Sequence, residues 1–325
     1  ARKAIDLPGV RAGVTTPPQL ANGLPRFSLR DHDEYVSITM EFRCNLKCVH
    51  CMIEGTMDRL QAAPDEVFQQ VLDRQKSDGF WKGLVLTGSE ITLNSALPEM
   101  AERARDAGFE RVRIQTHGMH LSRPGYAHRL YDAGVNEYFV SVAGGNRDSH
   151  DRITQVKGAW DKMMAGMTIL DQKDDVRLLT NSVVTEFSYR ELPEMVEALS
   201  DLKRLVQMEF WNYWPMAETD NKQLCASHSD ILPYLRNAIL AARSLGRFVE
   251  VKNFPECLLS ELGDALVNAQ PMLIIDPEFW TEFDRNGFNN CRHKETCTST
   301  ECLGLNTAYI ERFGWEESFL SPLRK

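Results

Sequence analysis

Three closely spaced cysteines are the residues best suited to chemistry in this sequence. Cys44, Cys48 and Cys51 are separated by three and two residues. Three thiolates in one loop can bind three irons of a four-iron, four-sulfur cubane and leave the fourth iron open to a small chelating molecule. Structural zinc prefers four protein ligands, and His50, between Cys48 and Cys51, is awkwardly placed to be the fourth. The spacing therefore favours an iron–sulfur cluster with an open coordination position.

A second group of cysteines lies near the end of the sequence. Cys291, Cys297 and Cys302 are spaced by five and four residues, and Cys257 stands upstream of them. Four thiols can hold a second four-iron cluster or a structural zinc ion. If Cys257 is not a ligand, one iron of such a cluster is open to substrate. Cys225 is left over, and most lone cysteines pack inertly in a core.

From residue 35 onwards, short β-rich segments alternate with amphipathic, helix-like segments. The predicted strands are 35–40, 83–87, 111–116, 137–143, 176–184 and 206–213. The predicted helices are 64–77, 95–107, 126–133, 160–171 and 191–202, and a further helical pattern covers 230–245. This alternation predicts an α/β fold, a partial (β/α)6 TIM-like barrel of parallel strands linked by helices. The ligand site is expected at the carboxyl ends of the strands.

The sequence divides into three predicted regions. Residues 1–34, rich in proline and glycine, are expected to form an extended arm, and 35–215 the barrel. In 216–325 the alternation fades and the cysteines of the second group appear, which predicts a separate C-terminal domain organised by metal.

The loop of the first three cysteines resembles the signature of the radical S-adenosylmethionine (radical SAM) superfamily, a C-x3-C-x2-C loop after the first strand of a partial barrel. The resemblance implies that the open iron binds the amino and carboxylate groups of S-adenosylmethionine (SAM). Electron transfer then releases methionine and a 5'-deoxyadenosyl radical. It also implies that His50 lies near the adenine, although a plain surface position is the alternative.

The ends of the following strands extend this resemblance. Gly88, Ser89 and Glu90 are similar to the family's Gly-Gly-Glu motif, which binds the methionine ammonium, with Ser89 replacing the second glycine. Thr116 and His117 stand where the family often has Thr-Asn before a glycine. Ser141 and Asn181 stand on the next two predicted strands at positions that imply contacts with the SAM carboxylate or ribose. Each of these residues could instead cap a helix or bond to its neighbours within the barrel.

Charge and hydropathy limit the class of partner and the location. With 37 Lys and Arg against 46 Asp and Glu, the net charge of −9 disfavours DNA and RNA as substrates. The sequence lacks an apolar run long enough for a membrane helix and a recognisable export signal. We therefore expect a protein of the cytoplasm, where its thiols stay reduced.

Taken with the resemblance, these observations predict a two-cluster radical SAM oxidoreductase of peptide modification or natural-product biosynthesis. Its substrate is expected to be a peptide or a small polyhydroxylated metabolite, and its electron donor an external protein such as flavodoxin or ferredoxin. The C-terminal cysteines resemble those of members with an auxiliary cluster, which could accept an electron during dehydrogenation or crosslinking. Three alternatives remain: a redox-neutral epimerase that uses Cys225 as hydrogen donor, a radical RNA-modifying enzyme and a non-catalytic metal-binding protein.

Overall fold

The computed structural model describes residues 10–11, 34–53 and 59–324. Within them, nine strands form one sheet in the order β1-β9-β2-β3-β4-β5-β6-β7-β8. All neighbouring pairs are parallel except β1 with β9. The strands are β1 (Val10–Arg11), β2 (Tyr35–Glu41), β3 (Gly83–Gly88), β4 (Arg111–Thr116), β5 (Glu137–Ser141), β6 (Arg177–Val184), β7 (Leu205–Asn212), β8 (Phe248–Lys252) and β9 (Met272–Ile274).

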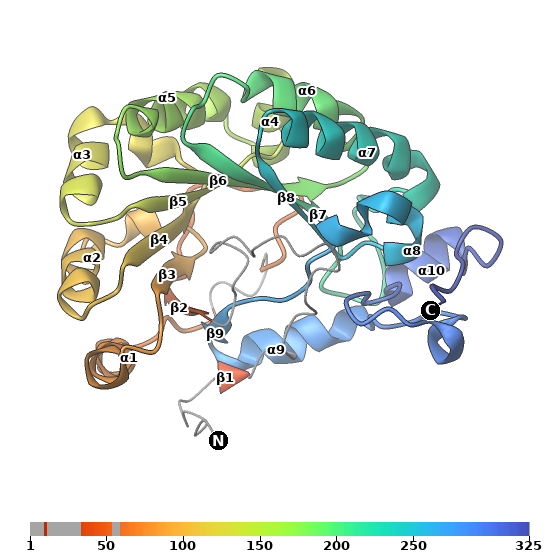
Figure 1. Ribbon diagram of the computed structural model, residues 1–325, viewed down its shortest axis with the longest axis horizontal. Helices are drawn as coiled ribbons and strands as arrows, with labels where there is room; N and C mark the ends of the chain where they lie inside the picture. Colours follow the sequence, from red (N-terminus) through yellow and green to blue (C-terminus); the bar gives the residue numbers. More distant parts are fainter. Residues whose placement is uncertain (1–9, 12–33, 54–58, 325) are drawn as a thin grey trace.

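Helices cover the outer face of this sheet, which curls into an open half-barrel (Figure 1). The helices of the barrel are α1 (Asp65–Asp78), α2 (Leu97–Asp106), α3 (Pro124–Asp132), α4 (Arg147–Thr154), α5 (Ala159–Asp171), α6 (Leu192–Ala198) and α7 (His228–Ser244). The C-terminal region adds α8 (Glu256–Leu259), α9 (Pro277–Phe283) and α10 (Thr307–Phe313). None of the helices in the described part of the chain is long and apolar enough to cross a membrane.

The predicted fold class is confirmed, and all six predicted strands are present. Two further parallel strands, β8 and β9, were not predicted. Strand β8 has the sequence Phe-Val-Glu-Val-Lys, in which Glu250 and Lys252 suggest a solvated segment, yet both side chains are buried. Helix α4 was also missed, because its apolar residues are few, and α6 ends four residues earlier than predicted.

The sheet continues past the predicted boundary between residues 215 and 216. Helix α7 and strand β8 extend the barrel beyond this position, and β9 joins the opposite side of the sheet beside β2. The order of the strands in the sheet does not mark a domain boundary at this position, so the boundary stays a prediction. Most of the predicted arm, 1–34, lies outside the described residues.

Strand alternation separates an apolar outer face from a polar interior. Side chains such as Ile38 and Leu86 are fully buried in the main apolar core against the helices. Inside the barrel, at the amino ends of the strands, the Arg113 Nε donates to Glu137 Oε2 at 2.9 Å, and the Arg113 guanidinium lies over the ring of Tyr35. This buried group fills the amino end of the interior, so the space for chemistry lies at the carboxyl end.

Candidate functional site

The first cysteine loop leaves the carboxyl end of β2 and is attached to the end of α4. The Val49 N donates to the Ile153 carbonyl at 3.0 Å, and the Lys47 N donates to the Thr154 carbonyl at 3.2 Å. Carbonyls in the last turn of a helix lack partners within that helix, so the loop satisfies them. Helix α4, which sequence reasoning missed, therefore serves as the support of this loop.

Cys44, Cys48 and Cys51 lie close enough to influence one another's ionisation. Burial, followed by the neighbouring Cys44 and Cys51, raises the pKa of Cys48 to about 12. Burial likewise raises the pKa of Cys44, against an opposing hydrogen bond from the Leu46 N to Cys44 Sγ at 3.4 Å. Grouped thiols of this kind become thiolates when a metal supplies the compensating positive charge.

The described residues contain no group of three or more His, Cys, Asp or Glu side chains arranged around a single metal ion. A cubane does not require that arrangement, because each thiolate binds a different iron. The grouped thiols and the N–H donor to sulfur on Cys44 suit an iron–sulfur cluster.

Gly88 and Ser89, at the end of β3, pass directly beside the last residue of β2. A Cβ atom on Gly88 would lie 1.9 Å from the carbonyl oxygen of Glu41, so only glycine fits there. The Ser89 N donates to the same carbonyl at 2.9 Å. The Ser89 Oγ is buried, and no hydrogen-bond partner for it is present in the described part of the chain. An unsatisfied hydroxyl at this edge suits contact with a polar cosubstrate.

Glu90 is fully buried and organises the ends of β3 and β4. Its carboxylate accepts hydrogen bonds from the Thr92 N at 3.0 Å, the Thr116 Oγ1 at 2.7 Å and the His117 N at 2.8 Å. These contacts bring together three of the residues singled out in the sequence, Glu90, Thr116 and His117. The contact of Glu90 with a methionine ammonium stays a prediction. In the structure, the Glu90 carboxylate holds the ends of β3 and β4 together through these hydrogen bonds.

His117 connects this network to the cysteine loop. Its Nε2 lies 2.7 Å from Asn45 Oδ1 and 3.1 Å from Glu90 Oε2, while its Nδ1 accepts from the Met119 N at 3.2 Å. With Nδ1 as acceptor, the proton of the neutral ring is on Nε2 and points to these oxygens. Burial lowers the pKa of His117, and the nearby Glu90 carboxylate only partly offsets it. Sequence reasoning missed Asn45, whose only signal was its place between two cysteines.

Ser141 and Asn181 are direct neighbours across β5 and β6, as the predicted shared site requires. A backbone hydrogen bond joins the same two segments one residue further on, where the Val142 N donates to the Asn181 carbonyl at 2.8 Å. His50, on the cysteine loop, has a buried Nδ1 for which the described residues provide no hydrogen-bond partner. The predicted cosubstrate residues thus follow the carboxyl edge of β2 to β6.

A charged group inside the barrel was not predicted. Glu209 on β7 is the register partner of both Asn181 on β6 and Glu250 on β8. The Lys252 Nζ donates to Glu250 Oε2 at 3.0 Å and lies 4.0 Å from Glu209 Oε2, and the Trp211 Nε1 donates to Glu209 at 2.7 Å. The sequence shows only that polar and apolar residues alternate on β7 and β8, a pattern that does not distinguish a polar inner face from a solvated one.

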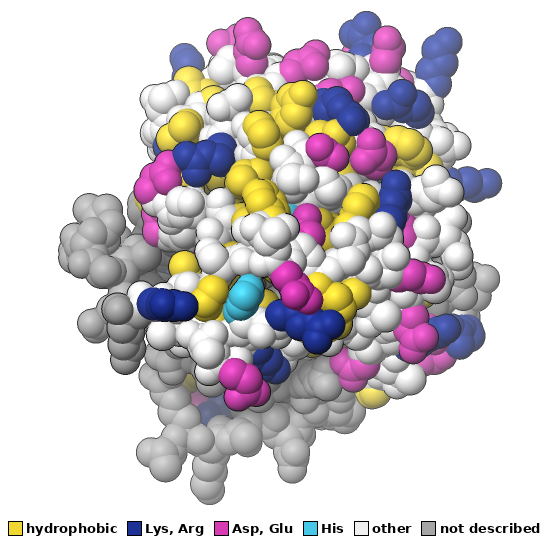
Figure 2. All heavy atoms as spheres, turned by 90° about the vertical axis from the view of Figure 1, so that its right-hand side faces the viewer, with side chains coloured by type: hydrophobic (Ala, Val, Ile, Leu, Met, Phe, Trp, Pro, Cys, Tyr) yellow, Lys and Arg dark blue, Asp and Glu magenta, His cyan; other side chains and the backbone are white. Residues whose placement is uncertain are grey.

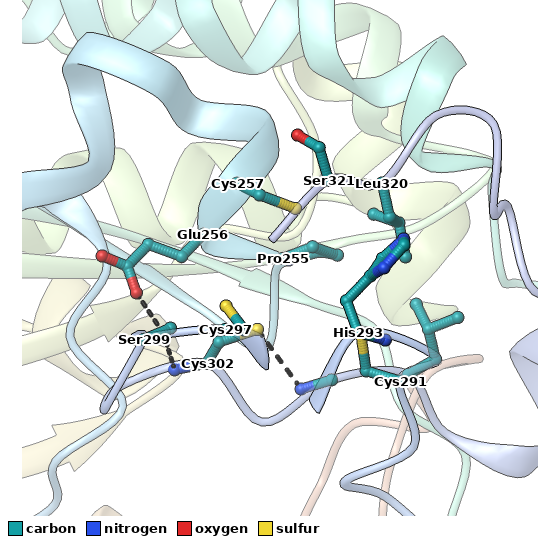
Figure 3. Close-up of a pocket in the computed structure, with 12 residues that line it drawn as sticks. Pro255, Glu256, Cys257, Cys291, His293, Cys297, Ser299, Cys302, Leu320 and Ser321 are labelled. Atoms are coloured by element: carbon teal, nitrogen blue, oxygen red, sulfur yellow. Dashed lines mark hydrogen bonds between the residues drawn. The ribbon is translucent and has the colours of Figure 1, made fainter. Parts of the chain in front are cut away.

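The second cysteine group surrounds one cavity, although its members lie far apart in the sequence. Cys257 comes from α8, and the other three come from the chain between α9 and α10 (Figure 3). The lining of the cavity also includes His293 and Ser299. The four predicted auxiliary residues are therefore brought together, which their spacing alone did not establish.

The thiols of this cavity accept backbone hydrogen bonds as Cys44 does. The His293 N donates to Cys291 Sγ at 3.4 Å, and the Gly304 N donates to Cys302 Sγ at 3.4 Å. Burial, with smaller contributions from the other three cysteines, raises the pKa of Cys257 to about 11. Hydrogen bonds to sulfur and mutual proximity suit ligation of a four-cysteine metal centre.

Cys225 lies outside both groups, in the segment between β7 and α7. It is buried beside Tyr213 and Leu224, with Val49 of the cysteine loop packed against the same apolar cluster. Burial, together with the Asp220 carboxylate, which accepts a hydrogen bond from the thiol, raises the pKa of Cys225. The thiol is therefore neutral and close to the first cysteine loop.

The fold and the site define an α/β half-barrel whose polar and thiol-bearing residues gather at the carboxyl edge of its strands. Residues 38–199 match the family model described as the Radical SAM superfamily. The chain belongs to this superfamily. Membership implies a [4Fe-4S] cluster and SAM.

Two curated relatives each match about half of the chain. One is the AdoMet-dependent heme synthase of Methanosarcina barkeri, which is 31% identical over 161 residues, covering 49% of this chain and 45% of the relative. The other is a probable GTP 3',8-cyclase of Methanopyrus kandleri, which is 29% identical over 170 residues, with coverages of 52% and 54%. The chain thus spans about half the length of these relatives.

A similar solved structure is SuiB of Streptococcus suis bound to its precursor peptide SuiA. The two folds superpose with a TM-score of 0.51 at 16% sequence identity, over 66% of this chain and 49% of SuiB. At this identity the likeness establishes the shared fold.

Proposed function

We propose that this chain is a two-cluster radical SAM oxidoreductase acting on a peptide substrate. The observation that carries the proposal is the convergence of four thiols on one cavity in the C-terminal region. A second redox centre gives an electron a place to go after a hydrogen atom has been abstracted from the substrate. This favours a net oxidation, such as a dehydrogenation or a crosslink, in a compartment such as the cytoplasm where thiols stay reduced.

In this proposal, Cys44, Cys48 and Cys51 hold the cluster that cleaves SAM. When bound, that cluster supplies the electron that releases a 5'-deoxyadenosyl radical from SAM. The Glu90–His117–Asn45 network holds the cysteine loop against the ends of β3 and β4. The unsatisfied Ser89 Oγ and His50 Nδ1 would contact the cosubstrate.

Ser141 and Asn181 complete the cosubstrate site on β5 and β6. Their adjacency in the sheet allows both side chains to contact one ligand. The charged group on β7 and β8 lies next along the same edge, so it borders the substrate. Enclosure by the barrel and the C-terminal region keeps a carbon radical away from solvent.

Cys257, Cys291, Cys297 and Cys302 hold the auxiliary [4Fe-4S] cluster in this proposal. With Cys257 as the fourth ligand, all four irons have protein ligands and none is open to substrate. Such a cluster acts as an electron acceptor and does not bind the substrate directly. A structural zinc ion is the competing occupant, because it accepts the same four ligands.

A peptide is favoured as substrate over a small polyhydroxylated metabolite by the likeness to SuiB, whose structure holds its precursor peptide. The named products of the curated relatives, heme and a cyclised GTP, point instead to small molecules. The acidic net charge of −9 speaks against the RNA-modifying alternative. Family membership speaks against a non-catalytic metal-binding protein.

Anaerobic reconstitution tests the proposal directly. The reconstituted chain is expected to bind about eight irons, to absorb broadly in the visible range and to form 5'-deoxyadenosine from SAM after reduction. A peptide encoded by a gene beside the gene for this chain is expected to lose two hydrogens or gain a crosslink when it is incubated with the reconstituted protein. Tightly bound zinc in place of about four of the irons would exclude the auxiliary cluster.

A radical epimerase is the second candidate, and the position of Cys225 favours it. The neutral thiol of Cys225 lies close to the first cysteine loop, where it could return a hydrogen atom to a substrate radical. In ordinary water, an epimerase forms a product with the same mass as its substrate. In heavy water, the product of an epimerase incorporates deuterium. The Cys225→Ala variant of an epimerase loses this activity. A product two hydrogens lighter than the substrate, still formed by the Cys225→Ala variant, excludes the epimerase.

A further inference from the structure

The cavity that the four C-terminal cysteines line, here called the auxiliary cavity, also contains a buried nitrogen without a hydrogen-bond partner. His293 lines this cavity, and its Nε2 is buried. The described part of the chain provides no hydrogen-bond partner for this nitrogen. Figure 3 shows the imidazole ring at the wall of the cavity, between Cys291 and Leu320. Buried polar atoms of native proteins nearly always have a partner, so this nitrogen indicates a polar occupant of the cavity.

Two other polar side chains of the auxiliary cavity already satisfy each other. The Ser299 hydroxyl donates to the Glu256 carboxylate, and the Cys302 N donates to the Ser299 Oγ at 3.0 Å (Figure 3). The hydroxyl proton of Ser299 is therefore in use. His293 differs from both, because its Nε2 lines the same space and has no such contact.

The number of thiols indicates what the His293 Nε2 does when a cluster is bound. In the proposed cluster, four cysteines bind four irons, so no iron is left for the imidazole. The remaining atoms of a cubane that the ring can meet are sulfurs, which accept hydrogen bonds. A neutral imidazole has one donor nitrogen and one acceptor nitrogen. An Nε2 that contacts sulfur must therefore carry the ring proton and donate it in a hydrogen bond.

A donor from a side chain adds to the backbone donors that the thiols already have. The His293 N donates to Cys291 Sγ at 3.4 Å, and the Gly304 N donates to Cys302 Sγ at 3.4 Å. Hydrogen bonds to the sulfurs of an iron–sulfur cluster are among the factors that set its reduction potential. They stabilise the more negative, reduced state, and a cluster with more donors therefore accepts an electron more readily.

The charges on the surface of this region largely balance one another. Figure 2 shows the side of the molecule that carries α8 and α10, where basic and acidic side chains are interspersed. Arg292, the neighbour of His293, lies 3.2 Å from the Glu317 carboxylate, and Arg312 lies 2.9 Å from the Asp220 carboxylate. Paired charges of this kind favour neither redox state strongly, which leaves the donors inside the cavity to set the potential.

We propose that His293 donates a hydrogen bond from Nε2 to a sulfur of the auxiliary cluster and thereby raises the reduction potential of that cluster. This rests on the proposed function, in which the four cysteines hold an electron-accepting cluster. After hydrogen abstraction, the substrate radical loses one electron to the cluster and one proton to water. The imidazole keeps its own proton throughout. Its contribution is to make the reduced cluster more stable than the backbone donors alone would make it.

The test measures the reduction potential of the auxiliary cluster by itself. The reconstituted full-length chain carries alanine at Cys44, Cys48 and Cys51, so that the C-terminal group holds all of its iron. A redox titration follows the electron paramagnetic resonance signal of the reduced cluster. We expect His293→Leu to weaken electron binding about tenfold, which lowers the potential by about 59 mV for one electron. His293→Gln retains an N–H donor and should weaken electron binding less than about threefold.

Thr300→Val is the matched control, because the Thr300 side chain is exposed in the same segment and does not line the cavity. Its electron binding is expected to stay within about twofold of the parent chain. The inference is overturned if His293→Leu keeps the potential, or if Thr300→Val shifts it equally. It is also overturned if His293→Leu binds fewer irons than its parent, or if the parent shows the strong nitrogen hyperfine coupling of an iron-bound imidazole. A parent chain that binds zinc or no metal at its C-terminal cysteines would instead refute the proposed function, and this inference with it.

Discussion

The two cysteine groups gather several thiols around one space by different structural means. The first occupies a single short loop, 44–51, which is attached to α4 and connected to the barrel through Asn45 and His117. The second takes Cys257 from a four-residue helix and three further thiols from the irregular chain between α9 and α10. Both groups receive backbone hydrogen bonds on sulfur.

The difference indicates where each group obtains its order. Hydrogen bonds to α4 and to His117 position the first loop, so the barrel contributes to its order. The second group lies in segments with little regular structure, where a metal contributes directly to folding energy. The following predictions test this distinction, beginning with the largest expected effect.

Replacing Cys44, Cys48 and Cys51 with alanine is expected to abolish 5'-deoxyadenosine formation. Iron content should fall from about eight to about four per chain, because the second group keeps its cluster. Iron assays and chromatography of the reaction measure both quantities. If the triple variant still cleaves SAM, the first group is not the site of reduction.

Replacing Cys257, Cys291, Cys297 and Cys302 with alanine is expected to separate cleavage from oxidation. Formation of 5'-deoxyadenosine continues, while oxidised product falls at least about tenfold, because the electron from the substrate lacks an acceptor. Hydrogen exchange is expected to increase in the C-terminal region and to change little in β2–β6. A variant with unchanged product yield would contradict the electron-acceptor role.

The Glu90→Ala substitution tests how strongly the barrel holds the first loop. It leaves the Thr92 N, the Thr116 hydroxyl and the His117 N without their acceptor, which costs about 4 kcal/mol of unfolding free energy. Urea unfolding of the metal-free chain measures this loss. Glu90→Gln keeps one acceptor oxygen and should lose less, whereas equal and small losses would show that the network contributes little.

Stability is expected to depend on pH through His150, on the helix that supports the first loop. Its Nδ1 accepts from the Ala143 N at 3.1 Å, which requires the neutral ring, and burial lowers its pKa to about 4. The ordinary pKa is about 6.5, so the unfolded chain binds the proton first. The contribution, up to about 3 kcal/mol, is therefore complete above about pH 6.5 and lost as the pH falls towards 4.

Urea unfolding of wild type and His150→Gln at several pH values checks this expectation. Glutamine does not titrate, so the stability advantage of the wild type over the variant should shrink as the pH falls. A constant difference between the two across this range would assign the acid sensitivity to other groups.

Much of the barrel could be predicted because its signals are local. Each of the six predicted strands is a short β-rich segment, and the three cysteines after β2 and Gly88, Ser89 and Glu90 at the end of β3 carry recognisable spacing. Strand β8 could not be predicted, because Glu250 and Lys252 neutralise each other inside the barrel at 3.0 Å. Their burial depends on a partner, and a single strand's pattern contains no information about partners.

The sequence by itself determined the class of chemistry and the order of the barrel, because thiol spacing within one loop and strand–helix alternation are properties of neighbouring residues. Only the tertiary structure decided that Cys257 joins Cys291, Cys297 and Cys302 around one cavity and that Asn45 is held by His117. These arrangements join residues distant along the chain. Their proximity is set by how the sheet and its helices pack, and spacing does not encode that.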